Sequence, residues 1–149
     1  MSETKSETLR LLAQDGEDLQ ILSSALQDGL VRMRDLSFDP RARRFILAAN
    51  RFCWEQAREP GRYQRVRSAL SVDGVRAVRS RKLRIEDADA LAYLLAVRFE
   101  PAETAPEGDM LLLFAGGGEI RLDCECIDVV LADIGEPWPT RRRPNHGAG

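Results

Sequence analysis

The run of three glycines at 116–118, in the segment FAGGGEIRL, is the stretch of this chain that most resembles part of an active site. Consecutive glycines can hold a phosphate when they lead directly into a helix, because backbone N–H groups and the helix dipole then converge on the anion. Apolar residues alternate on both sides of the glycines, at Met110, Leu112, Phe114, Ile120, Leu122 and Cys124. This alternation predicts a strand before and a strand after the run. We therefore expect a hairpin turn, to which glycine is suited by its access to positive φ.

The three cysteines offer a second kind of chemistry, which is redox or metal binding. Cys124 and Cys126 form a Cys-Glu-Cys sequence, which is neither a CxxC motif nor close to a histidine. An odd number of cysteines in a chain without an export signal favours reduced thiols. We expect small residues packed at a junction between a strand and a helix, and no metal site.

The sequence contains few residues that could act as a catalytic acid or base. The single histidine, His146, lies in the terminal segment RRRPNHGAG, which is a poor place for a positioned base. Carboxylates from Asp123, Glu125 and Asp128 could hold a metal, but acidic residues are also common where a helix begins. The sequence favours a protein without catalytic residues, metal or cofactor. An enzyme with a carboxylate-based site is an alternative.

The charged residues are segregated along the chain. Residues 41–84 contain thirteen basic and three acidic residues, whereas residues 85–136 contain thirteen acidic residues against Arg98 and Arg121. If these blocks form neighbouring strands, cross-strand ion pairs would absorb most of the arginines. The same complementarity could join the basic face of one subunit to the acidic face of another. Both arrangements are open at this point.

Nucleic-acid binding is the alternative that the basic block suggests. Guanidinium groups on a sheet beside a stacking aromatic ring can bind single-stranded RNA or DNA. The candidates lie on a predicted hairpin within residues 62–84. They are Arg62, Tyr63, Arg65, Arg67, Arg76, Arg79, Arg81 and Arg84, with Lys82 among them.

These residues must be positioned by strands and helices that the sequence also predicts. We expect strands at 8–12, 30–38, 44–54, 63–72 and 75–83, with turns at residues 39–42 and at Asp73-Gly74. An acidic start at residues 15–18 and apolar residues at helical spacing predict a first helix, which Gly29 ends. The segment 89–100 contains the helix-favouring run ALAYLLA, but its longer apolar alternation favours a strand.

A second helix is predicted after the glycine hairpin. Asp123 could cap it, and Gly135 and Pro137 could end it. Its apolar residues Ile127, Val130, Leu131 and Ile134 fall at helical spacing.

These elements predict an α+β fold in one domain, residues 1–139, followed by a basic and flexible tail, residues 140–149. A mainly antiparallel sheet of about six to eight strands would pack against the two helices. A strand meander closed by a carboxy-terminal helix is also compatible with a barrel like that of pleckstrin-homology domains.

Several segments together resemble a bacterial family, domain of unknown function 2948. They are LRLLAQDGEDLQILSSALQDGLVRM (9–33), RFCWE (51–55), LSVDGVRAVRSRKL (70–83), LAVRFEP (95–101) and LLFAGGGEIRLDCECIDVVLADIGEPW (112–138). The resemblance implies a cytoplasmic bacterial protein with no assigned activity, so it implies no site residues.

The function that we expect is therefore non-catalytic binding or assembly, through a protein partner or self-association. The polar amino terminus and the absence of a long apolar run argue against a signal peptide and against a membrane partner. We expect a cytoplasmic protein.

Overall fold

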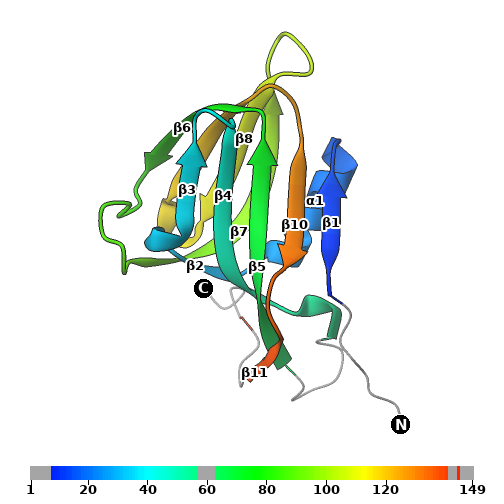
Figure 1. The fold of residues 1–149 in the computed structure, drawn as a ribbon, viewed down its shortest axis with the longest axis vertical. Helices are drawn as coiled ribbons and strands as arrows, with labels where there is room; N and C mark the ends of the chain where they lie inside the picture. Colours follow the sequence, from blue (N-terminus) through cyan, green and yellow to red (C-terminus); the bar gives the residue numbers. More distant parts are fainter. Residues whose placement is uncertain (1–7, 57–62, 141–143, 145–149) are drawn as a thin grey trace.

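A computed structural model describes residues 8–56, 63–140 and 144 of the chain (Figure 1). The predictions made for Arg62, for His146 and for most of the tail at 140–149 fall outside these residues. Within them, no helix is both long and apolar enough to cross a lipid bilayer.

The described residues form eleven strands and one α-helix, α1, which spans Gly16–Leu26. The strands are β1 (Arg10–Ala13), β2 (Gly29–Arg32), β3 (Leu36–Asp39), β4 (Arg44–Phe52), β5 (Tyr63–Asp73), β6 (Val75–Arg81), β7 (Leu91–Pro101), β8 (Gly108–Phe114), β9 (Glu119–Cys124), β10 (Val129–Asp133) and β11 (Trp138–Thr140). Short 3-10 turns occur at Met33–Asp35, Trp54–Gln56 and Ala115–Gly117.

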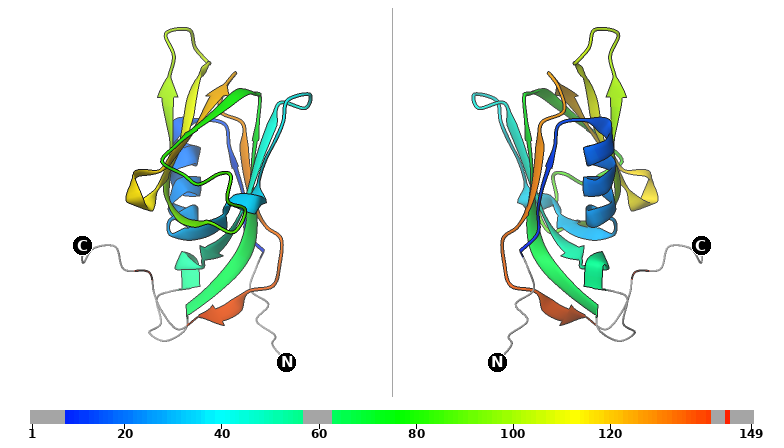
Figure 2. Two further views of the ribbon diagram at one scale, coloured as in Figure 1. Left: turned by 90° about the vertical axis from the view of Figure 1, so that its left-hand side faces the viewer. Right: turned by 90° about the vertical axis from the view of Figure 1, so that its right-hand side faces the viewer.

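All the strands belong to one antiparallel sheet. Its order is β1-β10-β5-β4-β2-β7-β8-β9-β6, with β3 paired to β4 and β11 paired to β5. The sheet curls over, so that the half around β5 faces the half around β8, as Figure 2 shows from two sides. The apolar core lies between the halves and includes Leu70, Leu112, Leu122 and Leu131, which are fully buried.

The chain passes from one half to the other at Gly74. We predicted a hairpin there, and this prediction was wrong, because β5 and β6 do not pair with each other. Within the described residues, β5 pairs with β4, β10 and β11, whereas β6 pairs only with β9. Gly74 has a φ of 74°, and this left-handed conformation, which costs glycine little, bends one long strand across the core.

The helix α1 confirms the first predicted helix. Asp15 caps it, since Asp15 Oδ1 accepts a hydrogen bond of 2.8 Å from the N–H of Asp18. Leu19, Leu22 and Leu26 are buried on one face, and this face packs against β7, β1 and β4. The helix ends at Leu26, before the predicted stop at Gly29, which is instead the first residue of β2.

The fold is nearly all β, so the α+β prediction with six to eight strands and two helices was wrong. The second predicted helix does not form. Its segment is a loop followed by β10, which lies between β1 and β5. Val129 and Leu131 point into the core and are almost fully buried. Pairing with β1 on one edge and with β5 on the other determines the conformation here. It gives the backbone of this segment hydrogen-bond partners, and the β-branched residues of the segment favour a strand over a helix.

A pleckstrin-homology-like barrel with a carboxy-terminal helix is excluded for the same reason. The only α-helix among the described residues lies near the amino terminus, and Thr140 ends the short strand β11. The predicted strand at 30–38 is interrupted by the 3-10 turn at Met33–Asp35.

Two other predictions are confirmed. Residues 91–101 form the strand β7. The triple glycine joins β8 to β9, which pair with each other. Gly116 and Gly117 have φ values of 86° and 90°, so the run is a turn and leads into a strand.

Candidate binding site

Three of the predicted nucleic-acid residues, Arg65, Arg67 and Arg76, have hydrogen-bond or ion-pair partners within the protein. The guanidinium of Arg65 donates to the carbonyl of Asn50 at 2.8 Å and lies 5.8 Å from the ring of Phe52. Arg67 pairs with Asp35 at 3.0 Å. These arginines therefore offer little positive charge to a phosphate.

Arg76 is neutralised across the sheet, as the charge pattern had suggested. It pairs with Asp123 on β9 at 2.9 Å and with Glu107 at 3.2 Å. Arg43 likewise pairs with Glu125. Because Asp123 and Glu125 have arginine partners, they do not form a metal site with Asp128. No cluster of three or more metal-binding side chains occurs in the part of the chain that the structure describes.

Tyr63 does not lie beside the remaining arginines. It is the first residue of β5, at the end far from the bend into β6, and its ring packs 5.9 Å from that of Phe52. The ring of Trp54 also packs against that of Phe52, with the two ring centroids 4.6 Å apart. Of the predicted cations, Arg65 shares the ring of Phe52 with Tyr63, whereas the predicted stacking ring lies away from Arg79, Arg81 and Arg84.

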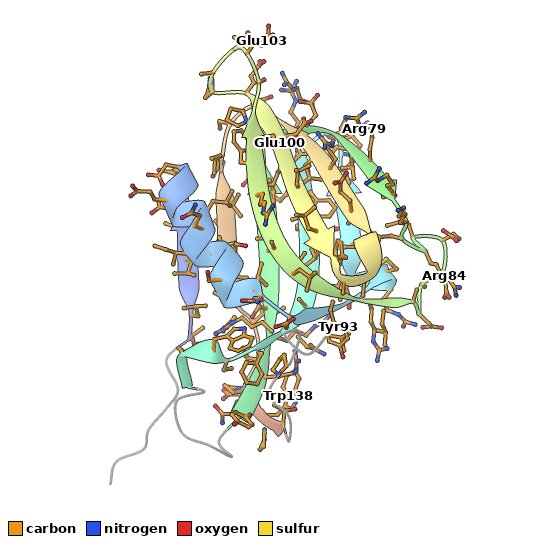
Figure 3. All side chains as sticks on the ribbon, turned by 180° about the vertical axis from the view of Figure 1, so that it is seen from behind. Arg79, Arg84, Tyr93, Glu100, Glu103 and Trp138 are labelled. Carbon is orange, nitrogen blue, oxygen red and sulfur yellow. The ribbon has the colours of Figure 1, made fainter. Side chains whose placement is uncertain are left out.

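The exposed cations that remain form a group at the end of β6. Arg79, Arg81, Lys82 and Arg84 are exposed, and none of them has an ion pair with another residue of the described ranges. Figure 3 shows Arg79 and Arg84 along the same side of the molecule. We name these four residues the basic edge. Glu86 and Asp87 follow them in the loop that leads to β7 and are also exposed.

The strand β6 is an edge of the sheet, since its described neighbour is β9 alone. The Phe114 N–H donates to the carbonyl of Gly118, so the alternating ladder points the backbone groups of Ile120 and Leu122 towards β8. The backbone groups of the alternate residues of β9 point the other way and pair with β6. In this register Glu119 lies opposite Arg81, Arg121 opposite Arg79 and Asp123 opposite Ala77.

The residues between them, Val78 and Ser80, direct their N–H and C=O groups away from β9. The basic edge therefore combines cationic side chains with backbone groups that a further strand could bond. The sequence indicated the cations but not the free edge, because pairing partners are set by the whole fold.

A second group of charged residues was not predicted and is buried. Arg51 is 1% exposed, and its guanidinium bonds both oxygens of Asp133 and both oxygens of Glu55 at 2.7 to 3.0 Å. Asp133 also accepts bonds from Ser68 Oγ at 2.6 Å and from the Leu9 N–H at 3.0 Å.

Burial alone would raise the pKa of Asp133, but the bonds from Arg51, Ser68 and Leu9 together hold it below the ordinary value. With these bonds the cluster ties β4, β5, β10 and the residue before β1 together.

A cavity of about 870 Å³ lies between α1 and β7. The loop between β7 and β8 and the residues Cys126 and Ile127 complete its walls. Cys126 is therefore in a loop that lines a cavity, not at the junction of a strand and a helix. Cys53 and Cys124 are buried, and burial raises the pKa of Cys53 to about 11 and that of Cys124 to about 12.

The model of a protein family matches residues 9–146 of the chain, and its description is "Protein of unknown function (DUF2948)". The match covers the segments on which the resemblance was based. A comparison with curated proteins gives no match.

Proposed function

The chain belongs to the DUF2948 family, whose description assigns no activity, and we propose that it is a non-catalytic domain that binds an extended acidic segment of a partner protein at the basic edge. The observation that carries this proposal is that, among the described residues, β6 has a strand on one side only, and that the four cations of the basic edge have no ion-pair partner there. Binding would add the partner as a further strand beside β6.

The backbone supports strand addition. Val78 and Ser80 direct their N–H and C=O groups to the free side of β6, and main-chain bonds of this kind provide affinity without requiring a particular partner sequence. Specificity would come from the side chains. Arg79 and Arg81 project from the same face of β6 and would meet alternate residues of an added strand.

The charge selects an acidic partner over a second copy of the same edge. Two β6 strands side by side would place Arg79 and Arg81 against like charges, which is destabilising. A basic edge is also a common device against aggregation. Self-association, if it occurs, would therefore use another surface.

Single-stranded nucleic acid is the competing ligand, because it is also extended and anionic. Binding of bases by sheet surfaces depends on aromatic rings on which the bases stack. Neither β6 (VRAVRSR) nor its neighbour β9 (EIRLDC) contains an aromatic residue. This favours a peptide over a nucleic acid.

The proposal can be tested with three fluorescent probes, measured by anisotropy at low and high salt. They are a short peptide alternating Glu and Val, the same peptide with Lys for Glu, and oligothymidylate. We expect saturable binding of the Glu peptide only. Tighter binding of oligothymidylate, with a steep salt dependence, would instead establish nucleic-acid binding.

Variants locate the site. Replacing both Arg79 and Arg81 with Glu is expected to weaken Glu-peptide binding at least about tenfold, since two ion pairs become repulsions. The matched control replaces Arg10 and Arg32 with Glu, because these exposed arginines lie on other strands, and its affinity should stay within about twofold of wild type.

Ser80→Pro tests the backbone contribution. It removes an N–H from the free side of β6 while keeping the side chains of the basic edge and the ladder with β9. We expect weaker peptide binding with an unchanged melting temperature. Equal binding by the folded Ser80→Pro protein would mean that the peptide is held by charge alone and that strand addition is wrong.

We also propose that the protein acts in the cytoplasm, as the resemblance to bacterial proteins implied. Support comes from the three cysteines, which are free and include two that are buried as single thiols.

A further inference from the structure

The cavity between α1 and β7 lies on a different part of the molecule from the basic edge. On the helix side its wall includes Leu19, Gln20 and Ser23, and on the strand side it includes Val97 and Phe99. The volume of about 870 Å³ falls in the range of sites for small organic molecules. The helix and the strand belong to the well-packed core, so the walls are preformed.

The cavity exists because β2 stops short along β7. β2 pairs with β7 only as far as Leu94, and beyond this point the helix lies where a strand would continue. Ser23 Oγ accepts a 2.8 Å bond from the N–H of Val97. Residues alternate along a strand, so Phe99 also directs its N–H and C=O towards the helix side.

This stretch of strand edge is too short to accept a peptide strand. Ser23 occupies the Val97 N–H, and Pro101 has no N–H to donate. Only the N–H of Phe99 remains on that side of the described strand. One donor suits the polar group of a small molecule better than a strand, which needs a repeating set of bonds.

The walls are mainly apolar, and most of the apolar side chains are aliphatic. Leu19, Val97, Pro106 and Ile127 contribute, and Phe99 is the one aromatic residue among the described residues of the lining. Flat ring systems are usually held between aromatic side chains, whereas an alkyl chain needs only an apolar channel of sufficient length. This lining favours a flexible aliphatic body.

The residues that line the cavity include one cation and one carboxylate, Arg98 and Glu107. Arg98 lines the cavity, is exposed, and has no ion pair with any residue of the described ranges. Glu107 also lines the cavity, but it bonds Arg76 at 3.2 Å. Among the described residues that line the cavity, Arg98 is therefore the cation without an ion-pair partner, and the geometry of a guanidinium matches a carboxylate.

We propose that this cavity binds an aliphatic carboxylate, with the alkyl chain between α1 and β7 and the carboxylate at Arg98 and the Phe99 N–H. The apolar chain would account for most of the affinity, and the arginine would select an anionic head group over a neutral or cationic one.

Cys126 provides a reporter inside the site. It lines the cavity and is half-buried, whereas Cys53 and Cys124 are buried with raised pKa values. An aromatic disulfide reagent should therefore label Cys126 first in the folded protein. Its thiolate displaces one thionitrobenzoate anion per cysteine, which is read by absorbance. A molecule in the cavity would slow this reaction.

The test compares three probes with the same chain and different head groups: decanoate, decanol and decyltrimethylammonium. We expect decanoate to slow the labelling of Cys126 about tenfold when it is present at ten times its Kd. Decanol should bind more weakly and decyltrimethylammonium most weakly. No slowing by decanoate, or equal slowing by all three probes, would overturn the proposal.

Two variants, each with a matched control, test whether the probe binds in the cavity. Arg98→Gln should weaken decanoate about fivefold and leave decanol unchanged, while Arg32→Gln, on β2, should change neither. Gln20→Trp fills the cavity and should abolish protection of Cys126. Ile21→Trp lies on the exposed side of the same helix, where Ile21 is 61% exposed, and should retain protection. Protection that persists in Gln20→Trp would place the probe elsewhere.

Discussion

At the scale of single residues, the most consequential contact is the buried bond between Arg51 and Asp133. Asp133 is 5% exposed and accepts four hydrogen bonds, which come from two strands, β4 and β5, and from the segment before β1. Removing one partner of a buried ion pair leaves a charge without compensation, which is far more costly than the loss of an exposed pair.

We predict that Asp133→Asn lowers the free energy of unfolding at neutral pH by about 3 kcal/mol. Asp123→Asn, which breaks the exposed pair with Arg76, should cost less than about 1 kcal/mol. Urea denaturation followed by tryptophan fluorescence measures both values. Similar costs for the two variants would contradict a special role for the buried pair.

The same residue gives a pH dependence. The pKa of Asp133 in the folded protein lies below its ordinary value of 3.8, so its stabilisation is complete above that value and is lost as the pH falls through the folded pKa. The free energy of unfolding of the wild type should therefore fall more steeply in acid than that of Asp133→Asn. The free energies of the two proteins should become similar at the lowest pH. Glu55 has a lowered pKa from Arg51 as well, despite its partial burial, so the variant will retain some acid sensitivity.

The sequence pointed to the chemistry at this scale only in part. It showed that Arg98 and Arg121 were the only cations in the acidic block, and Arg98 is one of the residues that line the cavity. It could not show that Arg51 is buried, because nothing in RFCWE distinguishes an internal arginine from an exposed one. Burial depends on strands that lie far apart in the chain.

At the scale of elements, the conformation of the glycine run is determined by the local sequence, whereas that of the segment after Asp123 is determined by the rest of the fold. Local sequence determines the conformation of the glycines, since positive φ values are accessible to them with little strain. For this reason the turn was predictable. The strand β10 has apolar residues at helical spacing, and only its position between β1 and β5 decides its conformation.

Gly117→Ala tests the turn. Gly117 has a φ of 90°, which an L-residue adopts with a strain of about 1–2 kcal/mol, so a loss of that size is expected in thermal or urea unfolding. Gly16→Ala is the matched control, because nothing lies within 4 Å of a Cβ at Gly16 and it begins a helix, where alanine is favoured. If Gly117→Ala had the same free energy of unfolding as the wild type, the backbone of the turn would have to adjust to alanine without strain.

At the scale of the whole molecule, the two charge blocks become neighbours. The basic strand β6 lies beside the acidic strand β9, and Arg76 pairs with Asp123 across them. The expectation of cross-strand neutralisation was therefore correct for part of the basic block. The end of β6 is the exception, because no strand covers its outer side among the described residues.

The curled sheet should unfold as one unit, because β5 and β6 form a chain that crosses both halves. Leu70 in β5 and Leu122 in β9 are fully buried in different halves, and Leu→Ala at either position should lower the free energy of the same single transition by about 2–5 kcal/mol. Leu12→Ala is the control, since Leu12 is 59% exposed and its substitution should cost less than about 0.5 kcal/mol. Two separate transitions in either core variant would show that the halves unfold independently.

The closure of the sheet by β1 and β10 also affects how the protein is made in the cell. The bond from the Leu9 N–H to Asp133 joins residues 124 positions apart, so a ribosome working at ordinary speed delivers the second partner roughly 6–25 s after the first. During that interval the nascent amino-terminal strand has no neighbour to bond. A chaperone that shields apolar strands at the exit tunnel is therefore expected to raise the yield of folded protein during synthesis.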